Sequence, residues 1–200
     1  MTAIMGLITA GMMVFYVFFS GGASAQSILQ EDEAGTLPRL FTTPTPAWHI
    51  LAGKLLAGFC LLAVQVVVLV IVSAVVFRID WGDPLPVVLV VAGLVAIAAG
   101  FGIMVNSFLR DTKQGGLVFG GLYTVLGMLG MSSVFTAGVQ GASPIGRAAL
   151  LVPHGWGVRA WEILLGGGGL ADVIGTVAVM LLLGLVFFAV GAVRFHRRYA

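Results

Sequence analysis

Charged side chains are scarce in this 200-residue sequence. Only 9% of the residues are Asp, Glu, Lys or Arg, whereas 60% are hydrophobic, and the mean hydropathy is +1.10. A soluble domain usually has roughly a quarter of its residues charged. We therefore expect lipid to surround most of this protein. The net charge of +2 is too small and too scattered for a nucleic-acid-binding surface.

Residues and motifs that carry chemistry are equally sparse. The single cysteine, Cys60, lies in an apolar run, where we expect a small buried side chain and no disulfide or zinc site. The histidines at 49, 154 and 196 are too scattered for a metal site, and we expect His154 to lie at the membrane interface. The sequence has no G-x-x-x-x-G-K-[ST] and no H-E-x-x-H motif. It therefore predicts no catalytic, cofactor or metal site in this chain.

Long apolar stretches dominate the sequence instead. Five are long enough to cross a bilayer, which takes about 20 residues: 6–29, 50–77, 85–109, 115–135 and 170–193. They exceed the length of strands and lack period-two alternation, and a helix in lipid satisfies its own backbone hydrogen bonds. The sequence thus predicts one all-α integral membrane domain over 1–200.

The distribution of Lys and Arg predicts the orientation. If the N-terminus is outside, seven of the ten basic residues fall on the cytoplasmic side, including Arg194, Arg197 and Arg198. We expect an inner or plasma membrane location with the N-terminus outside and the C-terminus inside. Residues 6–19 followed by Ala23-Ser24-Ala25 also resemble a signal peptide, but residues 1–5 lack the basic residues that such a peptide needs. We therefore interpret residues 6–29 as a membrane span and not as a cleaved signal peptide.

Residues 31–44, between the first two expected spans, begin with three acidic residues and predict a short helix on the membrane surface. Carboxylates such as that of Glu33 favour a helix start, where the dipole is positive. Thr36 is a candidate N-cap, and Pro38 is tolerated in a first turn.

The rest of this segment predicts one apolar face and an end to the helix. Leu37, Leu40 and Phe41 share a face, and Pro44 follows. Lys54 lies one turn into the next span, where it can reach back to lipid headgroups as a membrane-surface anchor. An ordinary amphipathic loop resting on the bilayer is the alternative interpretation.

The same segment resembles the hallmark of ABC-2 type permeases, the membrane subunits of ABC exporters. The matching positions are Glu31, Glu33, Gly35, Thr36, Leu37, Leu40, Pro44, Gly53 and Lys54. The resemblance implies a cytoplasmic coupling helix that docks in a cleft of a separate ATP-hydrolysing subunit. The implied contact residues are Glu31, Glu33, Gly35, Thr36, Leu37, Arg39, Leu40 and Pro44. Pro38 departs from the charged residue that is usual there.

The resemblance extends over about residues 6–195. Residues 100–114 look like the family's third-to-fourth span connection, and residues 153–165 look like its external interfacial or re-entrant segment. The family core has six spans, and this sequence begins where the second would be. The first span is then encoded upstream, supplied by another polypeptide, or absent from a shortened permease.

Polar and small residues within the spans are candidates for a pathway or for helix packing. Gln65 lies near the middle of the second span, and Asn106 lies near the cytoplasmic end of the third, where interfacial water could satisfy it. Gly116 and Gly120 form a small-xxx-small pair, for which we favour packing within the chain over a dimer contact.

The resemblance implies an exporter permease that works as a homodimer or heterodimer with two ABC ATPase subunits, which use the ATP. A mostly apolar pathway would suit a drug, a lipid or a lipid-linked glycan. A non-transporting scaffold, an incomplete permease fragment and a membrane enzyme using His154 and Glu162 are the alternatives.

Overall fold

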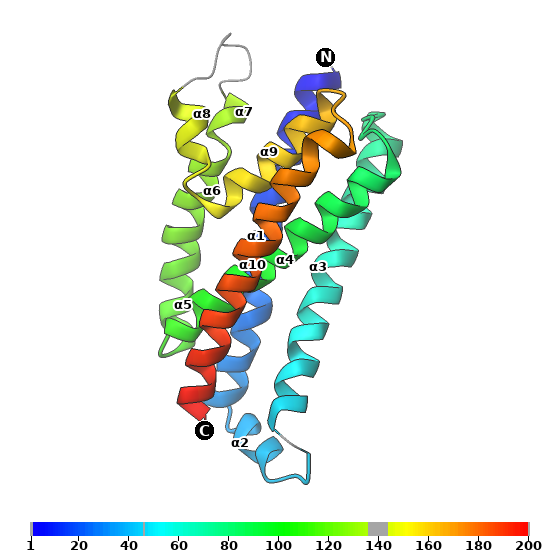
Figure 1. Ribbon diagram of the computed structural model, residues 1–200. Coiled ribbons are helices and arrows are strands. Elements are labelled where there is room, and N and C mark those ends of the chain that lie inside the picture. Colours follow the sequence, from blue (N-terminus) through cyan, green and yellow to red (C-terminus); the bar gives the residue numbers. More distant parts are fainter. Residues whose placement is uncertain (1, 46, 136–143, 200) are drawn as a thin grey trace.

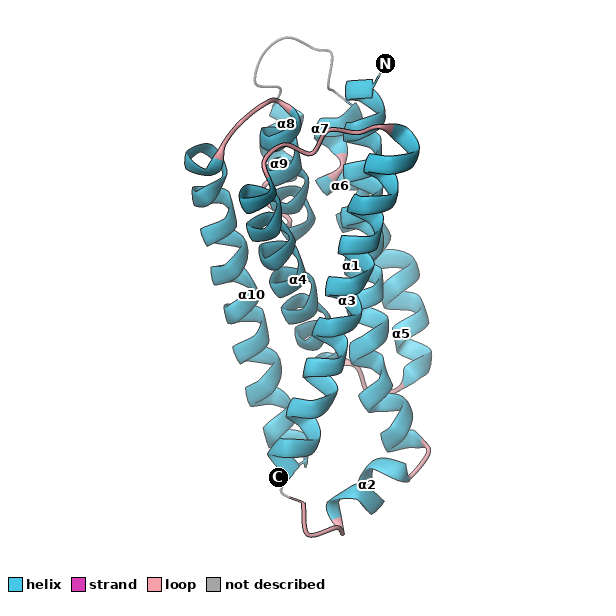
Figure 2. Ribbon diagram, turned by 90° about the vertical axis from the view of Figure 1, so that its right-hand side faces the viewer, coloured by secondary structure: helices cyan, strands magenta, loops and turns pink. Residues whose placement is uncertain are grey.

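Helices account for every regular element in the computed structural model, which describes residues 2–45, 47–135 and 144–199. Four helices are long: α1 (Thr2–Glu33), α3 (Ala47–Phe77), α4 (Pro84–Phe108) and α10 (Leu170–Tyr199). The shorter ones are α2 (Thr36–Phe41), α5 (Thr112–Val118), the π-helix η1 (Phe119–Tyr123), α6 (Thr124–Gly130), α7 (Ser132–Phe135), α8 (Pro144–Ala149) and α9 (Pro153–Leu165). The long helices run side by side as an elongated bundle (Figures 1 and 2). The prediction of an all-α membrane protein is confirmed.

Within the described residues, four helices are long and apolar enough to cross a membrane. They are Ile4–Glu33, Ala52–Phe77, Pro84–Phe108 and Leu170–Phe195. The fifth expected span, 115–135, is helical except for a turn at Met131, but it is divided among α5, η1, α6 and α7. Its glycines have low helix propensity, and a π-turn widens the helix locally. Residues 112–130 form one uninterrupted run of α- and π-helix, and a membrane span over 115–135 stays a prediction.

The two chain ends lie at opposite ends of the bundle. α1 starts at one end, and α10 finishes at the other, close to α2 (Figure 1). α2 thus lies beyond the tips of the long helices, as Figure 2 also shows. A coupling helix needs such a position, because it must reach a subunit outside the membrane.

Helix α4 is at the centre of the bundle. It packs most extensively on α10 and next on α1. A Cβ atom built on Gly100 would overlap the carbonyl of Gly184 in α10, and one on Gly102 would overlap the carbonyl of Gly21 in α1. Only glycine permits backbones to approach so closely, which is a common way for helices to associate in lipid.

Of the four long helices, α3 contributes least to the core. Most of its side chains are exposed, including a row of valines and Cys60, which is exposed rather than buried as expected. A transmembrane helix is apolar on its lipid-facing side as well as on its packed side, so composition alone does not distinguish the two.

Helix α9, at the end of the bundle opposite α2, packs against α1, α10 and α6. His154 in its first turn is fully buried and stacks on Phe18, with ring centroids 3.8 Å apart. The expectation of an interfacial His154 is therefore wrong. Glu162 is half-buried and lies eight residues further along α9. A buried histidine without access to solvent gives no support to the membrane-enzyme alternative.

Gly116 and Gly120 do not bring helices together within the described chain. Both are exposed, and a Cβ atom on either would meet no atom within 4 Å. The expected packing inside the chain is therefore wrong. On the same stretch Gly127 faces inward, where a Cβ would overlap the ring of Phe15.

We expect Gly100→Ala to lower the unfolding temperature of the purified chain in detergent. The added methyl must push α4 from α10, and overpacking costs about 1–3 kcal/mol, against a gain in helix propensity of about 1 kcal/mol. Gly116→Ala is the matched control, because its methyl points into open space and should leave the unfolding temperature unchanged or raised. Equal unfolding temperatures for the two variants would contradict the close contact of α4 and α10.

Candidate functional site

The segment 31–44 begins as the last turn of α1. The backbone N–H of Ala34 donates to the Gln30 carbonyl and that of Gly35 to the Asp32 carbonyl, both at 3.0 Å. Gly35 has a φ of 69°, in the left-handed region that ends many helices and that glycine adopts without steric cost. Gly35 therefore turns the chain from α1 into α2.

Two details of the predicted helix start are wrong, because α1 continues to Glu33. The acidic residues occupy the last turn of α1 and not the first turn of α2. Thr36 does not cap α2, which has Gly35 at its N-cap position and no side-chain cap. Its hydroxyl instead donates to the Glu31 carbonyl at 3.0 Å. Thr36 thereby satisfies a backbone carbonyl that the end of α1 leaves unpaired.

The Glu33 carboxylate lies at the start of α5 and not, as predicted, at the start of α2. Its two oxygens accept hydrogen bonds from the backbone N–H and the hydroxyl of Thr112, each at 2.7 Å. Thr112 is the first residue of α5, and Asp111 caps the same helix by accepting from the Gln114 N–H at 2.8 Å. The positive end of the α5 dipole favours the Glu33 charge. This contact joins the end of α1 to the α4–α5 connection.

The Glu31 carboxylate forms an ion pair with the ammonium group of Lys54. The side chain of Lys54 is 19% exposed and that of Glu31 is 34% exposed. Glu31 lies in the last turn of α1 and Lys54 lies two turns into α3, so the pair joins these two helices next to α2. Lys54, predicted to anchor the chain to the membrane surface, thus has a partner within the protein.

Helix α2 lies against the bundle through Leu37. This side chain is fully buried in a small apolar cluster formed with Ala25, Ile28, Ile103 and Phe195. Leu40, expected on the same face, is 38% exposed. A partner subunit can reach Leu40, but it cannot reach Leu37 unless α2 moves away from the bundle.

The outer side of α2 presents the remaining predicted contact residues. Arg39, Leu40 and Pro44 are exposed, as is Thr36. The helix closes with the hydroxyls of Thr42 and Thr43, which donate to the carbonyls of Arg39 at 2.8 Å and Leu40 at 2.7 Å. We refer to Arg39 and Leu40, together with Pro44 in the turn that follows the helix, as the outer face of α2. For Pro38 and Phe41 the structure describes the helical backbone but not the side chains.

The two polar residues expected within the membrane have different surroundings. Asn106 is fully buried, and its Nδ2 donates to the carbonyls of Gly22 at 2.9 Å and Gly102 at 2.8 Å. Asn106 therefore joins α4 to α1. Its full burial differs from the expected position at interfacial water, and its Oδ1 has no hydrogen-bond partner in the described part of the chain. Gln65 is half-buried on α3, and its side chain makes no hydrogen bond within the described part of the chain.

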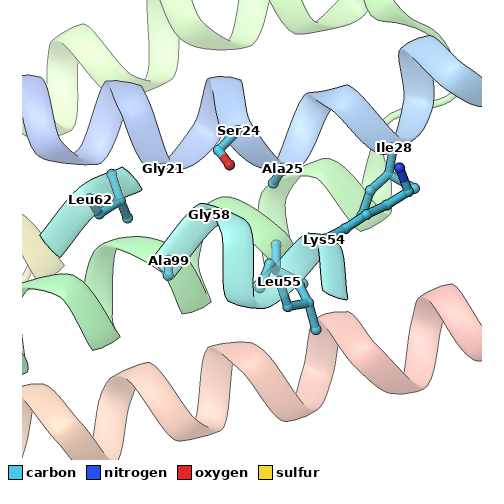
Figure 3. A pocket seen from close by; sticks show the side chains of 10 residues that line it. Gly21, Ser24, Ala25, Ile28, Lys54, Leu55, Gly58, Leu62 and Ala99 are labelled. Atoms are coloured by element: carbon cyan, nitrogen blue, oxygen red, sulfur yellow. The ribbon is translucent and has the colours of Figure 1, made fainter. Parts of the chain in front are cut away.

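A pocket that sequence reasoning missed lies beside the Glu31–Lys54 pair. Helices α1, α3 and α4 form its walls (Figure 3). Its lining residues are Gly21, Ser24, Ala25, Ile28, Lys54, Leu55, Gly58, Leu62, Ala99 and Ile103. The lining is mostly small or aliphatic, with Ser24 and Lys54 as its polar members. The small residues at 21, 24, 25, 58 and 99 were the only sequence signal for it.

Comparisons with known proteins support the resemblance noted in the sequence. The linearmycin resistance permease protein LnrN of Bacillus subtilis is 25% identical over 183 residues, which cover 91% of this chain and 47% of LnrN. The chain thus spans about half the length of that relative. No solved structure matches. The model of the family described as ABC-2 family transporter protein matches residues 2–199, so this multi-pass membrane protein belongs to the ABC-2 family of transporters.

Proposed function

We propose that this chain is the permease of an ATP-driven exporter and that a separate ABC ATPase subunit docks on the outer face of α2. The observation that carries the proposal is the position of α2 beyond the tips of the long helices, with Arg39, Leu40 and Pro44 exposed. An exposed arginine beside an exposed leucine offers charge and apolar contact together, which suits a helix that fits into a groove.

The contacts around α2 give a route from the ATPase to the spans. Leu37 joins α2 to α1, α4 and α10 through the apolar cluster. At the end of α1, Glu31 reaches α3 and Glu33 reaches α5. A force on α2 therefore acts on five helices at once. We propose that ATP-driven closure of the partner subunits shifts the permease between inward- and outward-facing states by this route.

The proposed orientation places α2 and the C-terminus in the cytoplasm, where ATP is available. Arg39, Lys54, Arg110 and Lys113 cluster near this end of the bundle, in agreement with the excess of basic residues on the cytoplasmic side of membrane proteins. The N-terminus and α9 then lie at the external side. We propose the inner or plasma membrane as the location.

The proposed substrate is a hydrophobic or amphipathic molecule, moved by a homodimer or heterodimer of permease chains. LnrN is named for resistance to linearmycin, which favours a toxic compound over a lipid or lipid-linked glycan. A non-transporting scaffold is the other candidate, and it would bind its partner without dependence on ATP.

Replacing Arg39 and Leu40 tests the docking surface. We expect Arg39→Glu with Leu40→Asp to abolish co-purification of an ABC ATPase in mild detergent, while the permease itself folds normally because both side chains are exposed. Lys113→Glu is the matched control for charge, since Lys113 is an exposed cation at the same end of the molecule. Mass spectrometry identifies the retained subunit. Retention of the ATPase by the double variant would refute docking on α2.

Replacing Glu33 tests its contact with α5. We expect Glu33→Ala to speed amide hydrogen exchange in the first turn of α5 about fivefold, because the loss of a helix cap costs about 1 kcal/mol. Lys113→Ala removes a neighbouring side chain and should leave the exchange unchanged. If exchange at Thr112 and Lys113 is the same in wild type and Glu33→Ala, the contact contributes nothing to the stability of α5.

A further inference from the structure

Arg194 lies where two candidate membrane spans end side by side. These spans of α4 and α10 run to Phe108 and Phe195, and the sequence becomes basic at 196–198. Arg194 joins the two helices, because its Nε donates to the Ser107 carbonyl at 3.2 Å. The ends of α4 and α10 point toward the same end of the bundle (Figure 1). The guanidinium group is therefore at the depth where hydrocarbon gives way to lipid headgroups.

Two contacts fix the Arg194 side chain against α4. Its Cζ lies 4.2 Å from the centroid of the Phe108 ring, in a cation–π arrangement, and its Nε is held by the Ser107 carbonyl. That carbonyl is among the last four of α4, which lack partners within the helix. A side chain that is already fixed loses little conformational entropy when it binds a further group.

The outer edge of the guanidinium group remains available to a ligand. Arg194 is exposed, and its two terminal amino groups make no hydrogen bond or ion pair with the residues that the structure describes. The acidic residue of α10, Asp172, is in the first turn of this long helix and supplies no counter-ion at its end. Two parallel N–H groups of a guanidinium match two oxygens of a phosphate.

The surroundings of Arg194 combine positive charge with apolar surface. Arg110 is exposed and lies two residues beyond Phe108, so their Cα atoms are at most about 7 Å apart. Phe108, which contacts Arg194, is 53% exposed, and Val193, which precedes it, is 56% exposed. Cations and exposed apolar side chains thus meet at the end of the two spans.

We propose that Arg194, together with Arg110, binds the phosphate of an anionic phospholipid whose acyl chains begin against Phe108 and Val193. The phosphate and the acyl chains of a phospholipid follow one another in the same order as these groups do along α4 and α10. Phe108 and Val193 belong to membrane spans, so a lipid can reach the cations and the apolar side chains together. A free phosphate ion or a soluble protein would leave the apolar side chains without a partner.

The charge of this patch favours an anionic headgroup over a zwitterionic one. The ammonium group of phosphatidylethanolamine would be repelled by the two arginines, whereas phosphatidylglycerol carries no cation. The sequence adds Arg197 and Arg198 one turn further along α10, and basic clusters directly beyond a membrane span attract anionic lipids. The carboxylates of Asp111 and Glu33 accept from N–H groups at the start of α5, whose dipole offsets part of their charge.

Native mass spectrometry of the full-length chain, delipidated and titrated separately with phosphatidylglycerol and phosphatidylethanolamine, tests the site. We expect phosphatidylglycerol to bind at least about fivefold more tightly. Arg194→Gln should weaken phosphatidylglycerol binding about fivefold, which corresponds to the contribution of about 1 kcal/mol from one basic side chain near an anionic surface. Arg147→Gln is the matched control, because Arg147 is an exposed arginine toward the opposite end of the molecule, and binding should be unchanged.

Two further measurements identify the source of the phosphate and the position of the site. Soluble glycerol phosphate in large excess should not displace phosphatidylglycerol. Phosphatidylglycerol with a photoreactive group next to its glycerol esters should cross-link wild type at residues 107–110 or 190–195, which requires no variant. Cross-links elsewhere, equal binding of the two lipids by wild type, displacement by glycerol phosphate, or undiminished binding by a folded Arg194→Gln variant would overturn the proposal. The ATPase is absent from these experiments, so their failure leaves docking on α2 untouched.

Discussion

The close backbone contacts of α4 are the constraint on which the rest of the structure depends. In lipid the hydrophobic effect does not drive helices together, so association relies on packing and on hydrogen bonds between helices. Gly100 and Gly102 allow α4 to meet α10 and α1 at backbone distance, and Asn106 adds hydrogen bonds to α1. This arrangement makes α1, α4 and α10 one unit, to which α3 and the segmented stretch from α5 to α7 are added at the sides.

The short helix α2 is positioned by that unit and not by its own sequence. Six residues are too few for a stable isolated helix. Its stability comes from Leu37 in the apolar cluster, from the turn at Gly35, and from the rigid end of α1 with its contacts to α3 and α5. The residues that hold α2 and those that it exposes are therefore different sets, although they alternate within one short stretch of sequence.

The sequence predicted the elements well and their surroundings less well. The four long helices and the short helix near residues 36–41 were predicted from length, hydropathy and turn residues, all of which are local properties. The sequence did not predict which apolar faces are buried, so Cys60, Gly116 and Gly120 were placed inside the protein although they are exposed. The contact of Glu33 with Thr112 spans 79 residues, and no local pattern contains it. The available signal was Asp111, a residue that favours helix starts, because the contact partner Thr112 begins the helix that Asp111 caps.

The bonds of Glu31 and Glu33 to distant parts of the chain have a consequence for engineering. A signature that appears continuous, from Glu31 to Pro44, needs Lys54 in one helix and the start of another at Thr112 to hold its shape. Grafting only residues 31–44 onto a second permease would transfer the sequence of the motif without its geometry. A functional chimera would have to exchange the three pieces together, as a discontinuous module.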